Sequence, residues 1–256
     1  MPKILFCGKG GSGKSTLLSL LALHLSETRD VVVIDTDESN TGLARMMGLD
    51  PPGQTLMDFL GGKDSVRRKM GPRGGPAESR ALFPAAGIAG GSFPGVCESA
   101  RGRIRLASVG KIEHAHEGCA CPMGVLARDV LGNVPAGADR WVLVDTEAGI
   151  EHIGRGLLEG MNAVVVVVEP SHDAVALAGK IVKLAAGEGR RCLAVLNRVA
   201  DGTESLLKEA LARVGIETAA TLANSQAVAK ANLLARPLAL EPFRKEIGKL
   251  AEALER

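Results

Sequence analysis

The 256-residue sequence predicts an α/β fold with three layers, in which helices flank both faces of a doubly wound, mostly parallel sheet. Three observations predict it. Short apolar runs alternate with segments of helical periodicity along the chain. The runs are nearly continuous, which is typical of parallel strands buried on both faces. Hydrophobic residues make up 46% of the chain but aromatic residues only 2%, so we expect an aliphatic core.

Seven apolar runs are expected to be the strands. They are 3–7, 31–35, 104–109, 141–145, 163–168, 192–196 and 218–222. Helices between consecutive strands would cover the two faces of the sheet, because parallel strands need long crossover connections. Helical spacing is clearest at 15–26, 41–47, 122–131 and 242–256. We expect one domain over residues 1–256.

One segment, residues 61–102, interrupts this alternation. It is rich in Gly, Pro and Arg and carries a local positive charge. Long excursions inside a compact domain are usually binding loops or disordered segments. We therefore expect a surface excursion with short helices in it, and both a solvated loop and a binding loop are open as interpretations.

The first apolar run leads into a phosphate-binding loop of the pattern Gly-x-x-x-x-Gly-Lys-Ser, and a helical run follows. Glycines let the backbone N–H groups approach phosphate oxygens, and the helix N-terminus adds partial positive charge. Lys14 is expected to reach the β- and γ-phosphates of ATP or ADP, and Ser15 to bind Mg²⁺. The nucleotide-binding residues expected from this loop are Gly8, Gly10, Gly11, Ser12, Gly13, Lys14, Ser15 and Thr16.

A second lysine, Lys9, lies early in the loop, in the run Lys-Gly-Gly-Ser-Gly-Lys-Ser. This run resembles the deviant Walker A loop of the MinD/ParA/nitrogenase-iron-protein ATPases. The resemblance implies slow, Mg-dependent hydrolysis of ATP by a homodimer that encloses the nucleotides. It also implies that Lys9 reaches the partner's phosphates, which is comparable to an arginine finger supplied in trans.

Acidic residues follow two of the apolar runs, at the strand ends beside the phosphate loop. In the resembled family the residue at the Asp37 position activates the attacking water, and Asp35 is expected to be structural. The alternative for Asp37 is a cap for the helix at 41–47. Asp145 ends the run 141–145 and is interpreted as a Walker B aspartate that binds a water ligand of Mg²⁺.

Asn197 follows the apolar run at 192–196. In the resembled family an asparagine at this place hydrogen-bonds the edge of adenine, so Asn197 is expected to read the base. The alternative is an asparagine that only forms a turn.

Two cysteines, Cys119 and Cys121, are separated by one residue and precede a helical run at 122–131. Cys121 would be the N-cap of that helix, where the pKa of a thiol is lowered. Two such pairs in a two-fold dimer would form a site of four thiolates, which suits Zn²⁺ when tetrahedral and Ni²⁺ when square-planar. The alternative is a pair of incidental reduced thiols.

The run Gly-Cys-Ala-Cys-Pro-Met and the run Thr-Glu-Ala-Gly-Ile-Glu-His at 146–152 resemble the CooC family of nickel-insertion accessory ATPases of carbon monoxide dehydrogenase. This resemblance extends over nearly the whole chain. It implies an ATP-dependent metallochaperone for Ni²⁺ or Zn²⁺ with carbon monoxide dehydrogenase as the client. Three histidines could assist a metal, and the alternative is that each is a solvated surface histidine. They are His114, His116 and His152.

Two other functions are open. A ParA- or MinD-type partitioning ATPase would act on DNA or membranes, but the net charge is only +2 and the helix at 242–256 has one apolar face suited to a core. We therefore expect no nucleic-acid or membrane partner. An iron–sulfur carrier would resemble the nitrogenase iron protein, whose two cysteines are widely spaced. Cytoplasmic location is expected, because no signal peptide precedes the first strand and the longest apolar run, 163–168, is short.

Overall fold

A twisted sheet forms the middle layer of the structure, a computed structural model that describes residues 2–70, 82–83, 88, 92–112, 121–135, 137, 139–154, 156–200 and 202–256. Its strands are β1 (Lys3–Gly8), β2 (Asp30–Asp35), β3 (Ser99–Arg101), β4 (Ile104–Ser108), β5 (Arg140–Asp145), β6 (Ala163–Val168), β7 (Arg191–Val199) and β8 (Glu217–Ala223). Within the described residues these eight strands follow the order β3-β4-β2-β5-β1-β6-β7-β8.

Neighbouring strands are parallel except at one edge, where β3 pairs antiparallel with β4. The predicted α/β fold class with a mostly parallel sheet is confirmed, and the seven predicted strands lie within a few residues of the observed ones. The sequence analysis missed β3 because its three residues, Ser-Ala-Arg, form no apolar run. β7 extends past residue 196 because Asn197 and Arg198 continue the strand through an irregular register against β8.

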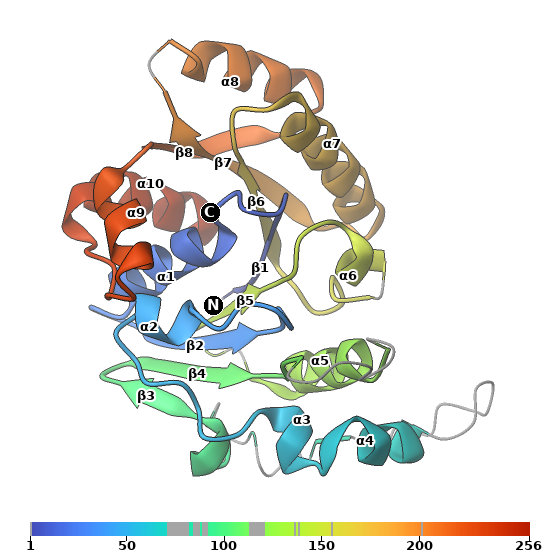
Figure 1. The fold of residues 1–256 in the computed structure, drawn as a ribbon. Coiled ribbons are helices and arrows are strands. Elements are labelled where there is room, and N and C mark those ends of the chain that lie inside the picture. The colour runs from blue at the N-terminus through green and yellow to red at the C-terminus, as the bar shows by residue number, and fades with distance from the viewer. Residues whose placement is uncertain are drawn as a thin grey trace.

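Helices cover both faces of the sheet (Figure 1). They are α1 (Lys14–Leu25), α2 (Leu43–Met46), α3 (Leu56–Phe59), α4 (Gly62–Met70), α5 (Cys121–Asn133), α6 (Glu151–Gly154), α7 (His172–Gly187), α8 (Glu204–Arg213), α9 (Gln226–Leu233) and α10 (Arg244–Glu255). Two short 3₁₀ segments are η3 (Gly95–Cys97) and η4 (Glu241–Phe243). Polar side chains fix several helix starts: the Ser171 hydroxyl accepts a hydrogen bond from the Ala174 backbone at the start of α7.

The two faces of the sheet carry separate aliphatic cores, as the composition predicts. One core packs α1, α2 and α10 against the sheet, and the other packs α3, α4, α5, α7 and α8 against the opposite face. The residues of the central strands β1 and β6 are all buried, because both faces are covered there. Trp141 in β5 is fully buried among aliphatic side chains.

Parts of the 61–102 segment are not at the surface. Val66 in α4, Phe83 and Cys97 are fully buried, and Phe93 is 6% exposed. The Phe83 ring lies 6.0 Å from the Phe59 ring and 6.4 Å from the Phe93 ring, so half of the chain's six aromatic side chains gather in one place. The expectation of a surface excursion was therefore incomplete: its described parts extend the core on the α5 side of the sheet.

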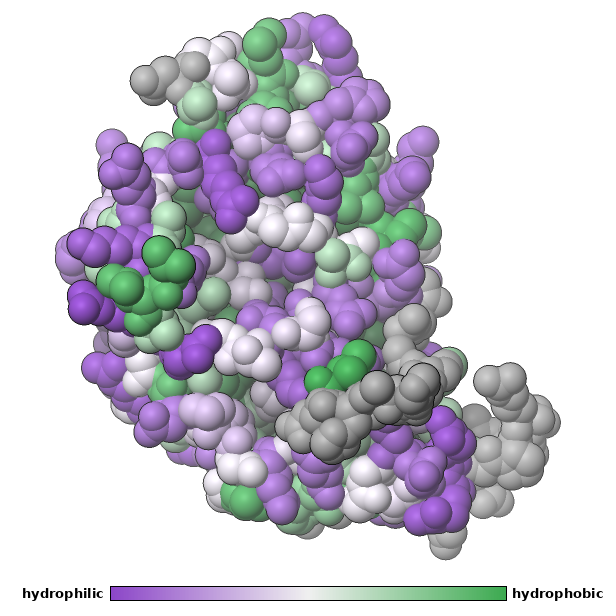
Figure 2. Space-filling model, viewed as in Figure 1, coloured by the Kyte–Doolittle hydropathy of each residue, from purple (hydrophilic) through white to green (hydrophobic). Residues whose placement is uncertain are grey.

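The C-terminal helix α10 lies against α1 and β8. Its apolar face is buried, with Ile247 and Leu250 fully inaccessible. Leu233 and Leu234, at the end of α9, are instead 84% and 46% exposed. Figure 2 shows a small green patch in this region on a face where purple and green are otherwise mixed. In the described part of the chain, no helix is long and apolar enough to cross a membrane.

The burial of α10 makes its leucines structural. Leu250→Ala should lower the free energy of unfolding by about 2–5 kcal/mol, because it leaves a cavity between α10 and α1. Leu233→Ala, the matched control at the surface, should change it by less than about 0.5 kcal/mol. Urea unfolding followed by circular dichroism measures both, and equal effects would contradict the packing of α10.

Candidate nucleotide-binding site and switch regions

The phosphate loop connects β1 to α1 at the carboxyl edge of the sheet, where parallel α/β sheets bind ligands. Two of its glycines are required by the fold. Gly8 has φ +149°, and a Cβ there would lie 2.5 Å from the Val167 carbonyl oxygen of β6. Gly13 has φ +95°, and a Cβ there would overlap the Asn197 side-chain amide. The loop can therefore pass close to β6 and β7 only with glycine at these places.

Asn197 in β7 holds the phosphate loop in place, because its Nδ2 donates to the Ser12 carbonyl oxygen at 2.7 Å. Asn197, the predicted base reader, is 8% exposed, and its Nδ2 is used to fix the loop. Recognition of the base by its Oδ1 stays a prediction. A cavity opens beside it, next to the start of α1. Its lining includes Gly13, Thr16, Asn197, Asn224, Ser225 and Asn232. Amide and hydroxyl groups beside a phosphate loop suit the polar edge of a nucleobase.

Ser15, the first-turn serine of α1, donates its hydroxyl to Asp145 Oδ2 at 2.6 Å. Asn40 Nδ2 donates to the same Ser15 hydroxyl at 2.8 Å and lies 3.3 Å from Asp145 Oδ2. The other carboxylate oxygen, Asp145 Oδ1, is buried with no hydrogen-bond partner among the described residues. A hydroxyl and an unsatisfied carboxylate oxygen form a hard oxygen donor set, so Ser15 and Asp145 fit Mg²⁺.

Two carboxyl groups lie side by side here, because β2 and β5 pair with Asp35 opposite Asp145. Burial, and then the charge of Asp35, raise the pKa of Asp145 to about 7, while the Ser15 hydrogen bond lowers it less. Burial likewise raises the pKa of Asp35 to about 6 against the opposing effect of Lys111. Lys111 Nζ lies 2.7 Å from Asp35 Oδ2, and the lysine side chain is only 14% exposed.

Asp37 shapes the turn that follows β2, the first switch segment. Its Oδ1 accepts hydrogen bonds from the Ser39 backbone at 2.9 Å, the Ser39 hydroxyl at 2.7 Å and the Asn40 backbone at 3.1 Å. Helix α2 begins at Leu43 and has Gly42 at its N-cap position, so the helix-cap alternative for Asp37 is wrong. Activation of water by Asp37 stays a prediction.

Sequence reasoning missed two residues of this site, Asn40 and Lys111. Lys111 Nζ also donates to the backbone carbonyl oxygens of Asp37 and Asn40. Lys111 follows β4 by three residues, and β4 neighbours β2, so its position at the carboxyl edge was available from the strand prediction. The order of the strands, which no local pattern determines, decides that it reaches Asp35.

Lys9 is at the surface of the loop, with its side chain 40% exposed. Its Nζ lies 3.2 Å from Glu169 Oε1, just past the end of β6. Lys14, in contrast, is 6% exposed, and its Nζ makes only a long contact of 3.5 Å with the Lys9 carbonyl oxygen. The two loop lysines therefore differ: Lys14 is enclosed by the loop, whereas Lys9 faces outward.

Helix α5 begins at Cys121, so this cysteine is the first helical residue and not the predicted N-cap. Cys121 is exposed and is disulfide-bonded in this structure. Cys119, His114 and His116 lie outside the described residues. We term the segment that follows β5, residues 146–152, the second switch segment. A small cavity joins the first turn of α5 to both switch segments, and its lining includes Thr36, Glu38, Met123, Gly124, Glu147 and His152.

His152 in α6 is 8% exposed, so it is not a surface histidine. Its Nε2 lies 3.4 Å from the Cys7 sulfur in β1. Cys7 is fully buried, and burial raises the pKa of its thiol. Within the described residues, no group of three or more His, Cys, Asp or Glu side chains could hold a metal ion.

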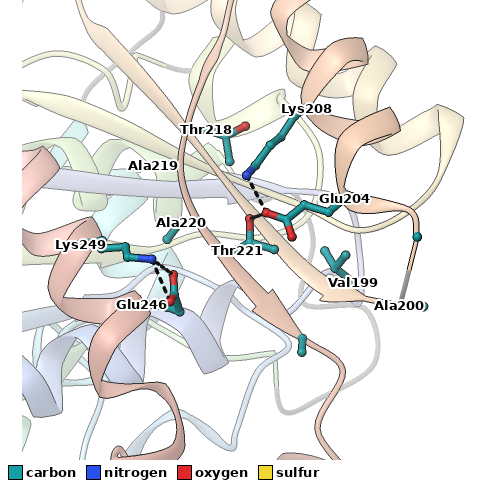
Figure 3. A pocket seen from close by; sticks show the side chains of 12 residues that line it. Val199, Ala200, Glu204, Lys208, Thr218, Ala219, Ala220, Thr221, Glu246 and Lys249 are labelled. Carbon is teal, nitrogen blue, oxygen red and sulfur yellow. Dashed lines mark hydrogen bonds and ion pairs between the residues drawn. The ribbon is translucent and has the colours of Figure 1, made fainter.

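A larger pocket lies at the other edge of the sheet, along β8 between α8 and α10 (Figure 3). Glu204 pairs there with Lys208 at 2.6 Å, and Glu246 pairs with Lys249 at 2.9 Å. These exposed ion pairs are neutral overall and lie apart from the phosphate loop, so this pocket is not the nucleotide site.

The sequence matches the family described as the CobQ/CobB/MinD/ParA nucleotide binding domain over residues 4–238. The chain belongs to this family. A phosphate loop with a buried lysine, a serine and two strand-end carboxylates agrees with a nucleotide-binding domain. The family accounts for the loop and the switches, but it does not specify a client or a cargo.

Several curated proteins are similar to the chain. An uncharacterized ATP-binding protein of Methanocaldococcus jannaschii is 34% identical over 240 residues, which cover 93% of this chain and 94% of that protein. The carbon monoxide dehydrogenase accessory protein CooC of Rhodospirillum rubrum is 32% identical over 203 residues, which cover 77% of this chain and 74% of CooC.

Solved structures support the fold. The septum site-determining protein MinD of Pyrococcus horikoshii, in complex with Mg-ADP, has a TM-score of 0.71 and 17% identity. The match covers 100% of this chain and 96% of MinD. A ParA family ATPase of Chlorobium tepidum has a TM-score of 0.65, with 17% identity and 100% and 98% coverage. These matches confirm that the chain has the MinD/ParA fold. At 17% identity they show the fold and nothing about the function.

The two buried carboxyl groups should make stability depend on pH. The ordinary pKa of 3.8 rises to about 7 for Asp145 and about 6 for Asp35, so the folded protein holds protons that the unfolded chain releases. Without nucleotide and Mg²⁺, the free energy of unfolding should fall from about pH 4 up to about pH 6 for Asp35 and about pH 7 for Asp145, by at most about 1.4 kcal/mol per pH unit for each group. Urea unfolding at several pH values measures this.

Asp145→Asn is the matched variant, because it keeps the shape and removes one titrating group. Its stability should decline less steeply over the same pH range, since only Asp35 remains to release a proton. Identical slopes for the variant and the wild type would show that Asp145 is already ionised in the folded protein.

Proposed function

We propose that this chain is an ATP-hydrolysing metallochaperone that acts as a homodimer and carries Ni²⁺ or Zn²⁺ between two Cys119/Cys121 pairs. Its client would be carbon monoxide dehydrogenase or a related nickel enzyme. The observation that carries the proposal is the position of Cys121 at the exposed start of α5, beside a cavity shared with both switch segments. The similarity to CooC over 77% of the chain supports the choice of client.

Hydrolysis is supported by the groups around the phosphate loop. Lys14 and the loop N–H groups would bind the phosphates, and Ser15 and Asp145 would hold Mg²⁺, which neutralises charge on the phosphates. Asp37 would orient the attacking water from the adjoining switch turn. Its Oδ1 already accepts three hydrogen bonds, which fix the carboxylate and leave its second oxygen for the water.

A dimer is supported by the outward position of Lys9. The Lys9 side chain is 40% exposed, so the phosphates of a second copy could approach it from outside the loop. Glu169 holds Lys9 at 3.2 Å, so dimerisation would exchange this ion pair for the phosphates of the partner. An ion pair this exposed costs little to break.

The metal site would need two subunits, because each supplies two sulfurs and thiolate sites for these metals have four ligands. Only thiolates bind metal, so the disulfide at Cys121 must first be reduced. Closure of the dimer on ATP would bring the four thiolates together. Opening after hydrolysis would release the metal to the client.

Metal stoichiometry tests the proposal. Under anaerobic conditions with a reductant, we expect one Ni²⁺ or Zn²⁺ per dimer in equilibrium dialysis, with a dimer in size-exclusion chromatography of the same samples. Cys119→Ala/Cys121→Ala should lose this metal while it still binds nucleotide. Cys192→Ala is the matched control, since this half-buried cysteine lies in β7, away from α5. Metal retained by the double variant would refute the thiolate site.

Loop lysine variants test the dimeric ATPase. Lys9→Gln should bind ATP within about threefold of wild type but hydrolyse it about 10³-fold more slowly, since a cation supplied in trans contributes about that much. Lys14→Gln should lose ATP binding. Glu169→Gln, which releases Lys9, should hydrolyse ATP at least as fast as wild type. Phosphate release assayed over a range of protein concentrations measures all three, and an unaffected Lys9→Gln would exclude action in trans.

A partitioning ATPase on membranes is less well supported. The apolar face of the C-terminal helix is buried against α1 and β8, so it is not available to insert into a lipid surface. An iron–sulfur carrier would show iron and inorganic sulfide in the stoichiometry experiment in place of Ni²⁺ or Zn²⁺.

A further inference from the structure

The Lys111 side chain makes three close polar contacts beside the nucleotide site. Its Nζ pairs with Asp35 Oδ2 at 2.7 Å and donates to the carbonyl oxygens of Asp37 and Asn40. One ammonium group therefore binds the end of β2 and both sides of the turn that Asp37 forms. All three donor positions of the lysine are used, and its side chain is 14% exposed.

The backbone beside Lys111 follows the same switch segment. Val109 N donates to the Asp35 carbonyl oxygen at 2.9 Å, and Ile112 N donates to the Glu38 carbonyl oxygen at 3.1 Å. Residues 109–112, which we term the β4 extension, thus run along residues 35–40 with Lys111 in the middle. A movement of the switch turn must either carry the β4 extension with it or break these bonds.

The β4 extension also contacts the helix that begins at Cys121. A Cβ on Gly110 would overlap the Met123 side chain, so Met123 of α5 packs directly on the Gly110 backbone. Val109, Met123 and Glu38 line one small cavity together. Met123 is 4% exposed and lies two residues after Cys121. A continuous path of described residues therefore leads from the switch turn through the β4 extension to the start of α5.

Building on the proposed function, we propose that Lys111 is a positioning residue that couples the nucleotide state of the switch turn to metal binding at the cysteine pair. The turn carries Asp37 and Asn40, and Asn40 bonds to the Ser15 hydroxyl, so ligands at the phosphate loop act on it directly. Lys111 transmits the displacement of this turn to the β4 extension, and Met123 transmits it to α5. Metal affinity rises when Mg-ATP orders the turn and falls after hydrolysis.

The test measures a ratio of affinities. Wild-type homodimer is titrated anaerobically with Zn²⁺ and with Ni²⁺, first without nucleotide and then with Mg²⁺ and a non-hydrolysable ATP analogue. We expect the analogue to tighten metal binding by a factor within about 5–150, the usual range of coupling between two sites. Lys111→Met should bring this ratio to about 1–2 when the analogue is supplied at a concentration that saturates the variant, as its own nucleotide titration establishes.

Two further variants serve as a control and as a substitute for Lys111→Met. Lys183→Met on α7 is the matched control, because this exposed lysine lies away from the switches, and its ratio should equal that of wild type. Lys111→Met leaves Asp35 buried without its cation, which destabilises a fold. Asp35→Asn/Lys111→Met removes both charges together, so it answers the question if the single variant does not fold, and it should show the same loss of coupling.

A merely structural lysine would weaken metal binding with and without nucleotide equally and leave their ratio unchanged, which overturns the coupling. Full wild-type ratios in both Lys111 variants also overturn it, and so does a ratio lost only because the analogue no longer binds. Wild type that binds metal with the same affinity in every nucleotide state refutes the coupling but not the metallochaperone. Wild type that binds no metal refutes the proposed function itself.

Discussion

The pairing of β2 with β5 places two buried carboxyl groups, Asp35 and Asp145, directly opposite each other at the carboxyl edge of the sheet. Burial raises the pKa of both carboxyl groups, and the charge of Asp35 raises the pKa of Asp145 further. Two surrounding residues offset part of the cost of burying these carboxyl groups. Lys111 supplies a cation to Asp35, and Ser15 supplies a hydrogen bond to Asp145. Asp145 Oδ1 has no hydrogen-bond partner among the described residues, and a divalent cation bound there would neutralise the remaining negative charge of the two carboxyl groups.

The same constraint ties the switch turn to two parts of the molecule. Asn40 joins the turn to the phosphate loop through Ser15, and Lys111 joins it to β4. A ligand that changes either partner changes the environment of Asp37, which lies between them. Removing one partner of a buried ion pair costs about 3–5 kcal/mol, because the remaining charge is left unpaired, so the Lys111–Asp35 pair is costly to separate. These contacts are the ones through which the proposed coupling would transmit nucleotide state.

Fold and function separate clearly in this family. MinD and ParA structures cover the chain almost completely at 17% identity, so they share its architecture without specifying a task. One local feature of this chain is a helix beside both switches that begins with an exposed cysteine. Neither the buried core nor the pocket at the β8 edge offers a comparable set of groups near the nucleotide site. The cysteine pair is consequently where a specific function is best sought.

The sequence by itself determined the layered α/β fold, the phosphate loop and the two strand-end aspartates. Each depends on neighbours in the chain: apolar runs bury strands, and Gly8, Gly13 and Lys14 act within one loop. It also indicated the buried face of α10, because helical spacing is a local property. Only the tertiary structure decided which strand ends meet. Lys111 reaches Asp35 because β4 lies next to β2, and Asn197 holds the phosphate loop because β7 lies beyond β6. Strand order arises from packing across the whole domain, and short sequence patterns carry no information about it.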